Sequence, residues 1–272
     1  MARKSPWEKE WNRLIKAEAK YTNKRKDGPM SVLFKKLDNV IPKKLSGLIS
    51  NALYKAFKMI FNKGTWAIEH TYNRKKKQAD YMINVYASEV MESPKTIKKF
   101  TRKANSSKFL NLLISFVEGV GMGILGLAIL DIPLFIAVVF KTVYEIVLTF
   151  GYDYHTTEEK MLILKIIEAA MSDEDDFLKK DREINEIIEY VVVSGDVVPK
   201  WEIELDDQMH SSSDSICNEL LYTRAIQKIP VVGMLGGLFN PVYVNRISRY
   251  AVLKYRRRFL SKKIYEHQQR KN

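Results

Sequence analysis

The feature that most constrains this sequence is a long apolar stretch from Phe109 to Asp153. Two apolar segments, one over 109–130 and one ending at residue 150, flank a turn-like Asp131-Ile132-Pro133. The first segment has 22 residues, which span about 33 Å as an α-helix at roughly 1.5 Å per residue. Strands rarely run that long. The stretch therefore predicts a central apolar helical hairpin over 109–150.

Capping signals support the second helix of this hairpin. Asp131 is a good N-cap residue, and Pro133 suits the first turn, where a missing N–H leaves no hydrogen bond unmade. Gly151 follows the last apolar residues and can adopt the left-handed conformation that ends many helices. We therefore expect the second helix to end at about residue 150.

Ionisable residues within the hairpin bear on whether it spans a membrane. An antiparallel pairing brings Glu118 level with Glu145 and about one turn from Lys141, so we expect these three to form a buried charge cluster. Each segment is nearly long enough to span a bilayer, yet a central Glu or Lys costs about 3 kcal/mol on insertion. We therefore prefer a core hairpin, with a spanning hairpin as the alternative.

Length and composition fit a folded helical protein. The chain has 272 residues, 46% of them hydrophobic and 28% charged, which is enough for a substantial core. We expect a basic leader over 1–30, with a short amphipathic helix, and a single domain over 31–272. The N-terminus is charged from its third residue and Cys217 is the single cysteine, so we expect a protein on the cytoplasmic side of a membrane that is not secreted.

The net charge of +13 is unevenly distributed. Residues 172–207 hold 13 acidic and 4 basic side chains, so the rest of the chain carries +22. Such a surface favours anionic partners, although a solvated lysine-rich face is the ordinary alternative.

Two basic amphipathic helices are the best candidates for contact with anionic lipid. Apolar residues recur at helical spacing over 41–70, and the helix expected over 245–269 interleaves arginine and lysine with aromatic residues. Helices of this kind lie well among lipid headgroups, whereas packing of the apolar stripe in the core is the alternative. The candidate cations are Lys43, Lys44, Lys55, Lys58, Arg256, Arg257, Arg258, Lys262 and Lys263.

Other helix boundaries are less strongly marked. Thr156 and Glu159 form a capping box that predicts a helix ending at Met171, and Ser172 predicts the start of the next. We interpret 194–215 as a loop or excursion that precedes a further helix.

Glycines punctuate both apolar regions, 109–150 and 229–244. Residues 121–126 match G-x-G-x-x-G, but that fingerprint needs a preceding strand and βαβ units, which a helical chain lacks. We therefore expect no nucleotide cofactor. Spaced glycines instead let helices approach closely, and the packing candidates are Gly119, Gly123, Gly126, Gly233 and Gly237.

No catalytic constellation stands out. The four histidines are scattered without H-E-x-x-H, so we expect no metal. The weak catalytic candidates are three carboxylates near the hairpin, Glu118, Asp131 and Asp153, and for Asp153 we expect burial with hydrogen bonds. The enzymatic alternative is an enzyme or carrier with a small apolar or lipid ligand in a pocket near the glycines, acting through one of these carboxylates.

Two groups of motifs resemble the EcsC protein family. The first is Glu118-Gly119 with spaced glycines, Asp131-Ile132-Pro133 and Phe150-Gly151-Tyr152-Asp153; the second is Ile229-Pro230-Val231-Val232-Gly233, Gly236-Gly237, Asn240 and the basic segment 255–260. The resemblance covers roughly 41–260 and leaves the leader outside. It implies a bacterial, helix-rich protein from a family named after a gene linked to an ABC transporter operon. It implies no particular reaction.

The sequence thus predicts an all-α protein with a peripheral place at a membrane. We expect it to bind anionic lipid or a membrane protein, such as a transporter-linked one, through its basic amphipathic helices. This function is non-enzymatic, and we expect no cofactor and no metal. Nucleic acid is the second alternative partner, supported by charge alone, because no recognised nucleic-acid-binding module is present.

Overall fold

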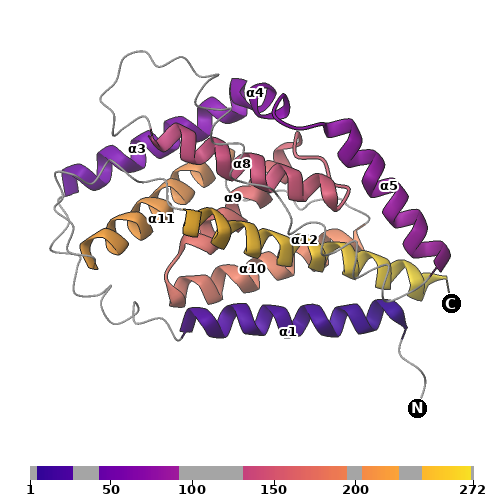
Figure 1. Ribbon diagram of the computed structural model, residues 1–272. Helices are drawn as coiled ribbons and strands as arrows, with labels where there is room; N and C mark the ends of the chain where they lie inside the picture. The colour runs from indigo at the N-terminus through magenta and orange to yellow at the C-terminus, as the bar shows by residue number, and fades with distance from the viewer. Residues whose placement is uncertain (1–4, 27–42, 92–130, 195–203, 227–240, 271–272) are drawn as a thin grey trace.

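The computed structural model describes residues 5–26, 43–91, 131–194, 204–226 and 241–270 (Figure 1). These residues form helices and short turns without a strand, which confirms the all-α class. In chain order the helices are α1 (Pro6–Lys26), α3 (Lys43–Met59), α4 (Thr65–Glu69), α5 (Arg74–Met91), α8 (Asp131–Thr149), α9 (Thr157–Met171), α10 (Glu174–Val193), α11 (Leu205–Ile226) and α12 (Pro241–Gln269). A π-helical turn, η1 (Ile60–Gly64), joins α3 to α4.

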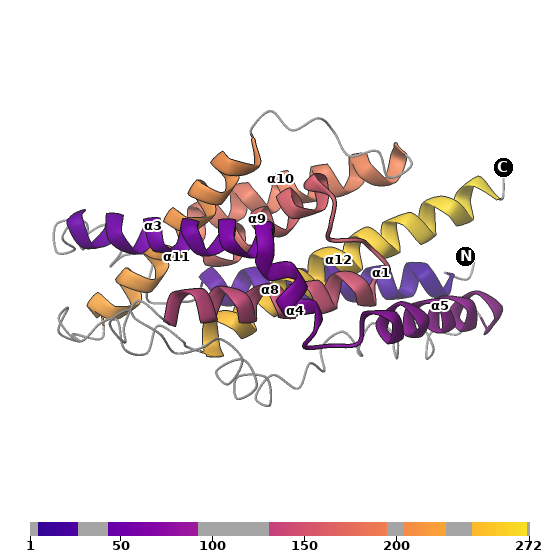
Figure 2. The same ribbon diagram turned by 90° about the horizontal axis from the view of Figure 1, so that it is seen from above.

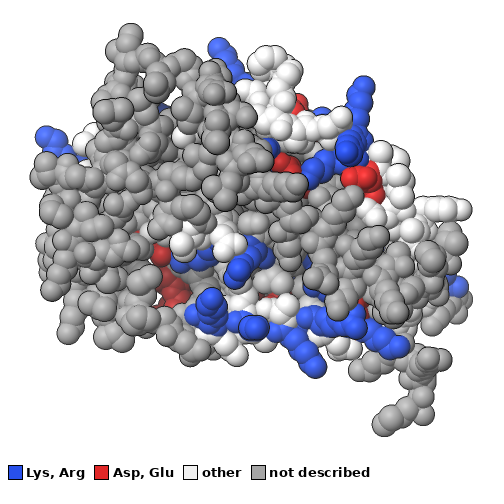
Figure 3. Space-filling model, in the orientation of Figure 1, with Lys and Arg blue, Asp and Glu red and all other residues white. Residues whose placement is uncertain are grey.

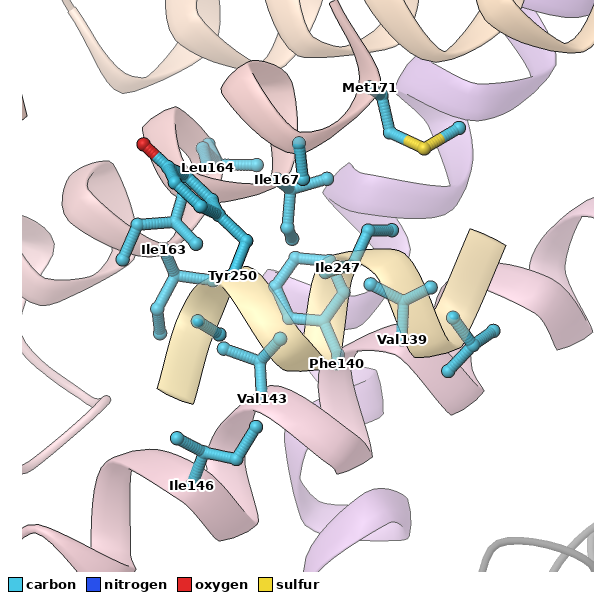
Figure 4. Packing of buried hydrophobic residues seen from close by; sticks show 14 of the residues in the cluster. Val139, Phe140, Val143, Ile146, Ile163, Leu164, Ile167, Met171, Ile247 and Tyr250 are labelled. Carbon is cyan, nitrogen blue, oxygen red and sulfur yellow. The ribbon is translucent and has the colours of Figure 1, made fainter. Parts of the chain in front are cut away.

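Helix α8 lies at the centre of the fold and packs against α12, α3, α4 and α5. Figure 4 shows Phe140 and Val143 of α8 facing Ile167 of α9 and Ile247 of α12. Residues 132–149 of this helix are long and apolar enough to cross a bilayer, and 78% of that window is buried inside the protein. Such burial is what a core helix shows. The first arm of the expected hairpin, 109–130, lies outside the described residues, so the pairing itself stays a prediction.

Helix α9 is almost wholly buried because α10, α11 and α12 surround it. Its N-cap is Thr156, whose hydroxyl accepts a hydrogen bond from the Glu159 N–H at 3.2 Å, as the capping box predicted. The next helix begins one residue later than predicted. Asp173, not Ser172, is its N-cap and accepts from the Asp176 N–H at 3.0 Å, because a carboxylate at this position also interacts favourably with the helix dipole.

Helix α11 begins at Leu205, ten residues before the predicted start, so the loop expected over 194–215 was wrong for its second half. Its serines obscured the pattern, since serine usually signals a turn. Here their hydroxyls are satisfied inside the protein: Ser213 donates to the Met209 carbonyl at 2.7 Å, and Ser212 to the Leu164 carbonyl at 3.3 Å. Small side chains then let α11 pack closely on α9 and α3.

Helix α1 docks on α12 and also touches α10. Trp7 and Leu14 are buried in the common core, and the Trp7 ring meets Phe259 edge-on at 6.3 Å. Farther along, Tyr21 stacks on Tyr250 at 5.4 Å. The amphipathic leader helix therefore covers the domain with its apolar stripe.

Helices α3, α4 and α5 follow one another along one side of the molecule, seen from above in Figure 2. Helix α3 packs on α11 and α8, and α5 packs on α8. At the end of the π-helical turn that joins α3 to α4, the Ile60 carbonyl accepts from the Thr65 N–H, and the Thr65 hydroxyl donates to the same carbonyl at 3.0 Å.

Gly151 ends α8 as predicted. Its φ is +82°, its N–H donates to the Leu148 carbonyl, and the Tyr152 N–H donates to the Val147 carbonyl, both at 3.1 Å. This pair of bonds is the Schellman arrangement. A side chain at 151 would overlap the Tyr81 ring of α5, so glycine is required here both by φ and by space.

Candidate functional site

An exposed stripe of lysine and apolar side chains runs along α3, η1 and α4. Every third or fourth residue points outward, and large apolar residues alternate with lysine or asparagine. Trp66 is 68% exposed, Leu48 62% and Met59 49%. In order, the stripe consists of Lys44, Leu48, Asn51, Lys55, Met59, Asn62 and Trp66. The buried stripe of the same helices, Ile49, Leu53, Ala56, Phe57 and Ile60, faces α8 and α11.

Helix α5 continues this character with its own exposed face. Its first turn carries Lys75 and Lys76, and Met82, Ile83 and Tyr86 follow at helical spacing. Each of these three apolar side chains is at least 65% exposed. A monomeric soluble protein rarely leaves large apolar residues together on its surface without a use for them. We call the exposed residues of the two stripes, together with Lys43 and Lys63, the α3–α5 face.

The lysines of the α3–α5 face lack internal partners. Within the described part of the chain, Lys43, Lys44, Lys55, Lys63, Lys75 and Lys76 are exposed and make no ion pair. Lys58, beside this face, differs: its ammonium donates to the Tyr54 hydroxyl at 2.9 Å and lies 3.5 Å from Asp206. The Tyr54 hydroxyl and then the Asp206 charge raise the pKa of Lys58, so it already has an acidic partner.

The three consecutive arginines of α12, Arg256 to Arg258, do not form part of an exposed cationic surface, contrary to expectation. Arg258 is 5% exposed and donates to Glu159 at 2.7 Å, and its guanidinium lies 3.9 Å from the Tyr152 ring centre. The Tyr255 hydroxyl donates to the other Glu159 oxygen at 2.6 Å, and burial raises the pKa of Tyr255 well above its ordinary value. Glu159 thus joins α9 to α12 through two buried partners.

The neighbouring cations of α12 are also engaged. Arg256 donates to Glu10 at 2.7 Å, and Arg257 donates to Glu18 at 2.6 Å, so both fasten α1 to α12. Lys263 pairs with Glu89 of α5 at 2.7 Å, and Lys262 is half-buried with an interaction of its own. The acidic partners are more than 150 residues away in sequence. For the two arginine pairs, a glutamate on the inner face of the leader helix was the signal in the sequence.

Part of the expected buried charge cluster is present. Lys141 is buried and lies 3.4 Å from Glu145, which also accepts from Lys77 of α5 at 2.7 Å. Burial lowers the pKa of Lys141, although Glu145 opposes the change. Glu118 lies outside the described residues, and Lys77 is the member that sequence spacing could not reveal.

Asp153 is exposed, which makes its expected burial wrong. Its carboxylate accepts from Arg74 at 3.2 Å and from the His155 N–H, so it braces the turn after α8. Beside it, the Tyr154 hydroxyl donates to Glu69 at 2.6 Å and lies 2.6 Å from the Tyr72 hydroxyl. These contacts fasten the α4–α5 junction to that turn, which is a structural use of the carboxylates.

The other candidates from sequence are not brought into a site. Asp131 is the first residue of α8, and nothing is described of its side chain. An open hollow of about 570 Å³ is lined by residues 69–75, which do not include Asp153. The proposed packing glycines, Gly119, Gly123, Gly126, Gly233 and Gly237, all lie outside the described residues. Among the residues described, no three His, Cys, Asp or Glu side chains gather as metal ligands.

Fold and surface together define the class of protein. It is an all-α protein whose core is closed by buried ion pairs. Its outer helices carry lysines that make no ion pair among the described residues, beside exposed apolar side chains. The sequence model of the EcsC protein family matches residues 8–260, and the chain belongs to that family. The match starts inside α1, so most of the leader is included, which corrects its expected exclusion. Searches of curated proteins and of solved structures found no match.

Proposed function

We propose that the protein associates peripherally with membranes by binding anionic lipid through the α3–α5 face. The observation that carries this proposal is the pairing of unpaired lysines with exposed Leu48, Met59, Trp66, Met82, Ile83 and Tyr86 on consecutive helices. Lysines attract anionic headgroups, while apolar side chains insert shallowly beneath them. Within the described part of the protein these lysines make no ion pair, and Trp66 contacts the His70 ring at 4.1 Å while remaining 68% exposed.

The energetic requirement is modest. Each lysine near an anionic membrane surface contributes about 1 kcal/mol, and six such lysines lie on this face. Burial of exposed apolar side chains adds to this, because a fully buried large side chain is worth about 1.5–3 kcal/mol. Binding of this kind should weaken as salt screens the lysines and should retain a part that salt does not remove.

The first experiment is co-sedimentation with vesicles of phosphatidylcholine alone and of phosphatidylcholine mixed with phosphatidylglycerol, over a salt series. We expect the protein to pellet with the mixed vesicles. The variant K44Q/K55Q should bind about 30-fold more weakly, since two lysines contribute roughly 2 kcal/mol. A matched control is K179Q/R182Q on α10, which removes two exposed cations outside the face and should bind like the unchanged protein.

The apolar contribution is tested separately. Trp66→Ser should weaken vesicle binding at high salt, where the lysines are screened, whereas Tyr190→Ser removes an exposed aromatic residue from α10 and should not. Trp66 fluorescence should also shift to shorter wavelength on binding, and this shift should vanish in Trp66→Phe. Equal recovery of the unchanged protein in the supernatant with both vesicle types would reject the proposal.

A further inference from the structure

A second cationic surface lies on the outer face of α1. Five cations follow one another at intervals of three or four residues, and all are exposed: Lys9, Arg13, Lys16, Lys20 and Lys24. In Figure 3 the Lys and Arg side chains form a row along the lower edge of the molecule, where Figure 1 places α1. From Lys9 to Lys24 the row covers 16 residues, so its ends lie about 22 Å apart at roughly 1.5 Å per residue. We call it the α1 row.

The internal ion pairs leave the α1 row uncompensated. Of the three glutamates of α1, Glu10 and Glu18 sit on the opposite face and are held by Arg256 and Arg257 of α12. The third, Glu8, is exposed, and its carboxylate accepts from the Ser5 N–H at 2.7 Å. Arg13 also reaches Glu10. Among the described residues, the four lysines of the row make no ion pair. The fold therefore directs two of the three carboxylates of α1 inward and the four lysines of the row outward.

The α1 row and the α3–α4 part of the α3–α5 face lie on opposite edges of the molecule. Helix α1 packs on α12 and α10, whereas α3 packs on α11 and α8. In Figure 1, α1 forms the lower edge and α3 and α4 run along the upper edge, with α12 and α8 between them. A bilayer that contacts α3 and α4 is thus on the far side of the protein from the α1 row.

We propose that the α1 row binds a second anionic bilayer, so that one molecule bridges two membrane surfaces. This inference rests on the proposed function of the α3–α5 face. A straight helix face matches a surface that is flat over its length, and all five cations can then approach headgroups together. Single-stranded nucleic acid usually stacks on exposed aromatic rings, and the exposed positions of α1 carry none. Among the exposed positions of α1, the large apolar side chain is Ile15, which is 39% exposed.

The two surfaces differ in kind, which makes bridging testable. The α3–α5 face combines charge with apolar insertion, whereas the α1 row depends almost wholly on charge. We therefore expect contact through the α1 row to be lost at moderate salt, while the first bilayer stays bound through the α3–α5 face.

The test uses vesicles of phosphatidylcholine mixed with phosphatidylglycerol, with clustering followed by turbidity and dynamic light scattering, and binding followed by co-sedimentation. The unchanged protein should bind and cluster them. K9Q/K16Q/K20Q/K24Q keeps good helix-forming residues and spares Arg13. It should still pellet with vesicles but need roughly 100-fold more protein to cluster them, allowing for screening.

A matched control removes four exposed cations elsewhere, K179Q/R182Q/R249Q/R270Q, and should cluster vesicles like the unchanged protein. Clustering by the α1 variant at the level of the unchanged protein would overturn the inference, as would vesicles that bind the unchanged protein yet stay dispersed. If the vesicles stay dispersed and the unchanged protein, but not the α1 variant, co-sediments with a nucleic acid, the row would be assigned to that partner. A protein that binds no vesicle at all would reject the proposed function itself.

Discussion

Helices α3 and α12 both carry many cations, yet the protein uses them in opposite ways. Arg256, Arg257 and Arg258 of α12 lie against the core and are held by Glu10, Glu18 and Glu159. The lysines of α3 lie on the surface, and within the described residues Lys44 and Lys55 have no acidic partner. Residue type already hints at this division, because a guanidinium makes planar, bidentate pairs that tolerate burial, whereas an ammonium is strongly hydrated.

This difference between α3 and α12 shows that a basic amphipathic pattern does not by itself locate a cationic surface. Helix α12 is in contact with α1, α8, α9 and α10, so almost every side of it is covered. Helix α3 contacts α11 and α8 and leaves one side open. The number of covering neighbours decides whether a cation becomes a brace within the fold or a group available to a partner.

The largest effect should come from breaking an internal brace. Glu159→Gln removes the charge that compensates Arg258 and weakens the hydrogen bond from Tyr255. Because a buried cation is then left uncompensated, we expect the free energy of unfolding to fall by about 3–5 kcal/mol. Urea unfolding followed by circular dichroism measures this. Glu158→Gln, the exposed neighbour on the same helix, is the control, and an equal loss in both variants would contradict the role assigned to Glu159.

A second comparison sets the glycine that ends α8 against one on the exposed helix α3. Gly151→Ala must adopt φ near +82° and displace Tyr81, so we expect a loss of about 2 kcal/mol. Gly47 of α3 has nothing within 4 Å of an added methyl group, so Gly47→Ala should gain about 0.5–1 kcal/mol. Thermal melting of both variants checks the opposite signs, and two changes of the same sign would refute the contrast.

Buried tyrosines of the interior should make the protein sensitive to alkaline pH. Burial raises the pKa of Tyr144, Tyr250 and Tyr255 above the ordinary value of 10.0. Below pH 10 each is protonated in both states; above it the unfolded chain loses protons first, so stability falls by about 1.4 kcal/mol per pH unit for each tyrosine. Lys141 has the opposite effect. Because its pKa is lowered in the folded protein, the stability lost by burying it diminishes as pH rises toward 10.5.

The variant Tyr144→Phe isolates one of these contributions. Its hydroxyl makes only a long contact of 3.4 Å with Thr65, so the variant should fold at neutral pH. Unfolding free energies measured between pH 9 and pH 11 should then decline less steeply, by about 1.4 kcal/mol per unit. The exposed Tyr190→Phe should leave the slope unchanged, and an unchanged slope in Tyr144→Phe would show that this residue does not contribute.

The smallest effect on stability should come from the exposed lysines. K44Q/K55Q should change the free energy of unfolding by less than about 0.5 kcal/mol, because surface substitutions away from packed features rarely do more. The same variant should bind vesicles about 30-fold more weakly, as described above. Urea unfolding and co-sedimentation on one preparation test both statements, and a large loss of stability would place these lysines in the fold instead of on a binding face.

Local signals in the sequence identified helices where capping and periodicity agreed. Thr156 and Gly151 take the conformations that their positions predicted, because a capping hydroxyl and a left-handed glycine act within one turn of chain. The start of α11 was missed because its serines are satisfied by α9, a contact between distant segments. Asp153 was misplaced for a similar reason: its partner, Arg74, belongs to a helix 79 residues earlier.

The sequence alone determined the helical class, the EcsC resemblance and the presence of more cations than the chain can neutralise, since these follow from composition and from periods of a few residues. Which cations have an acidic partner inside the protein depends on the tertiary structure. Glu10, Glu18 and Glu159 meet Arg256, Arg257 and Arg258 because three separate helices converge there. The lysines of α1 and α3 are left outward on the sides that the described helices do not cover. An ion pair needs contact within a few ångströms, and no linear pattern specifies that distance.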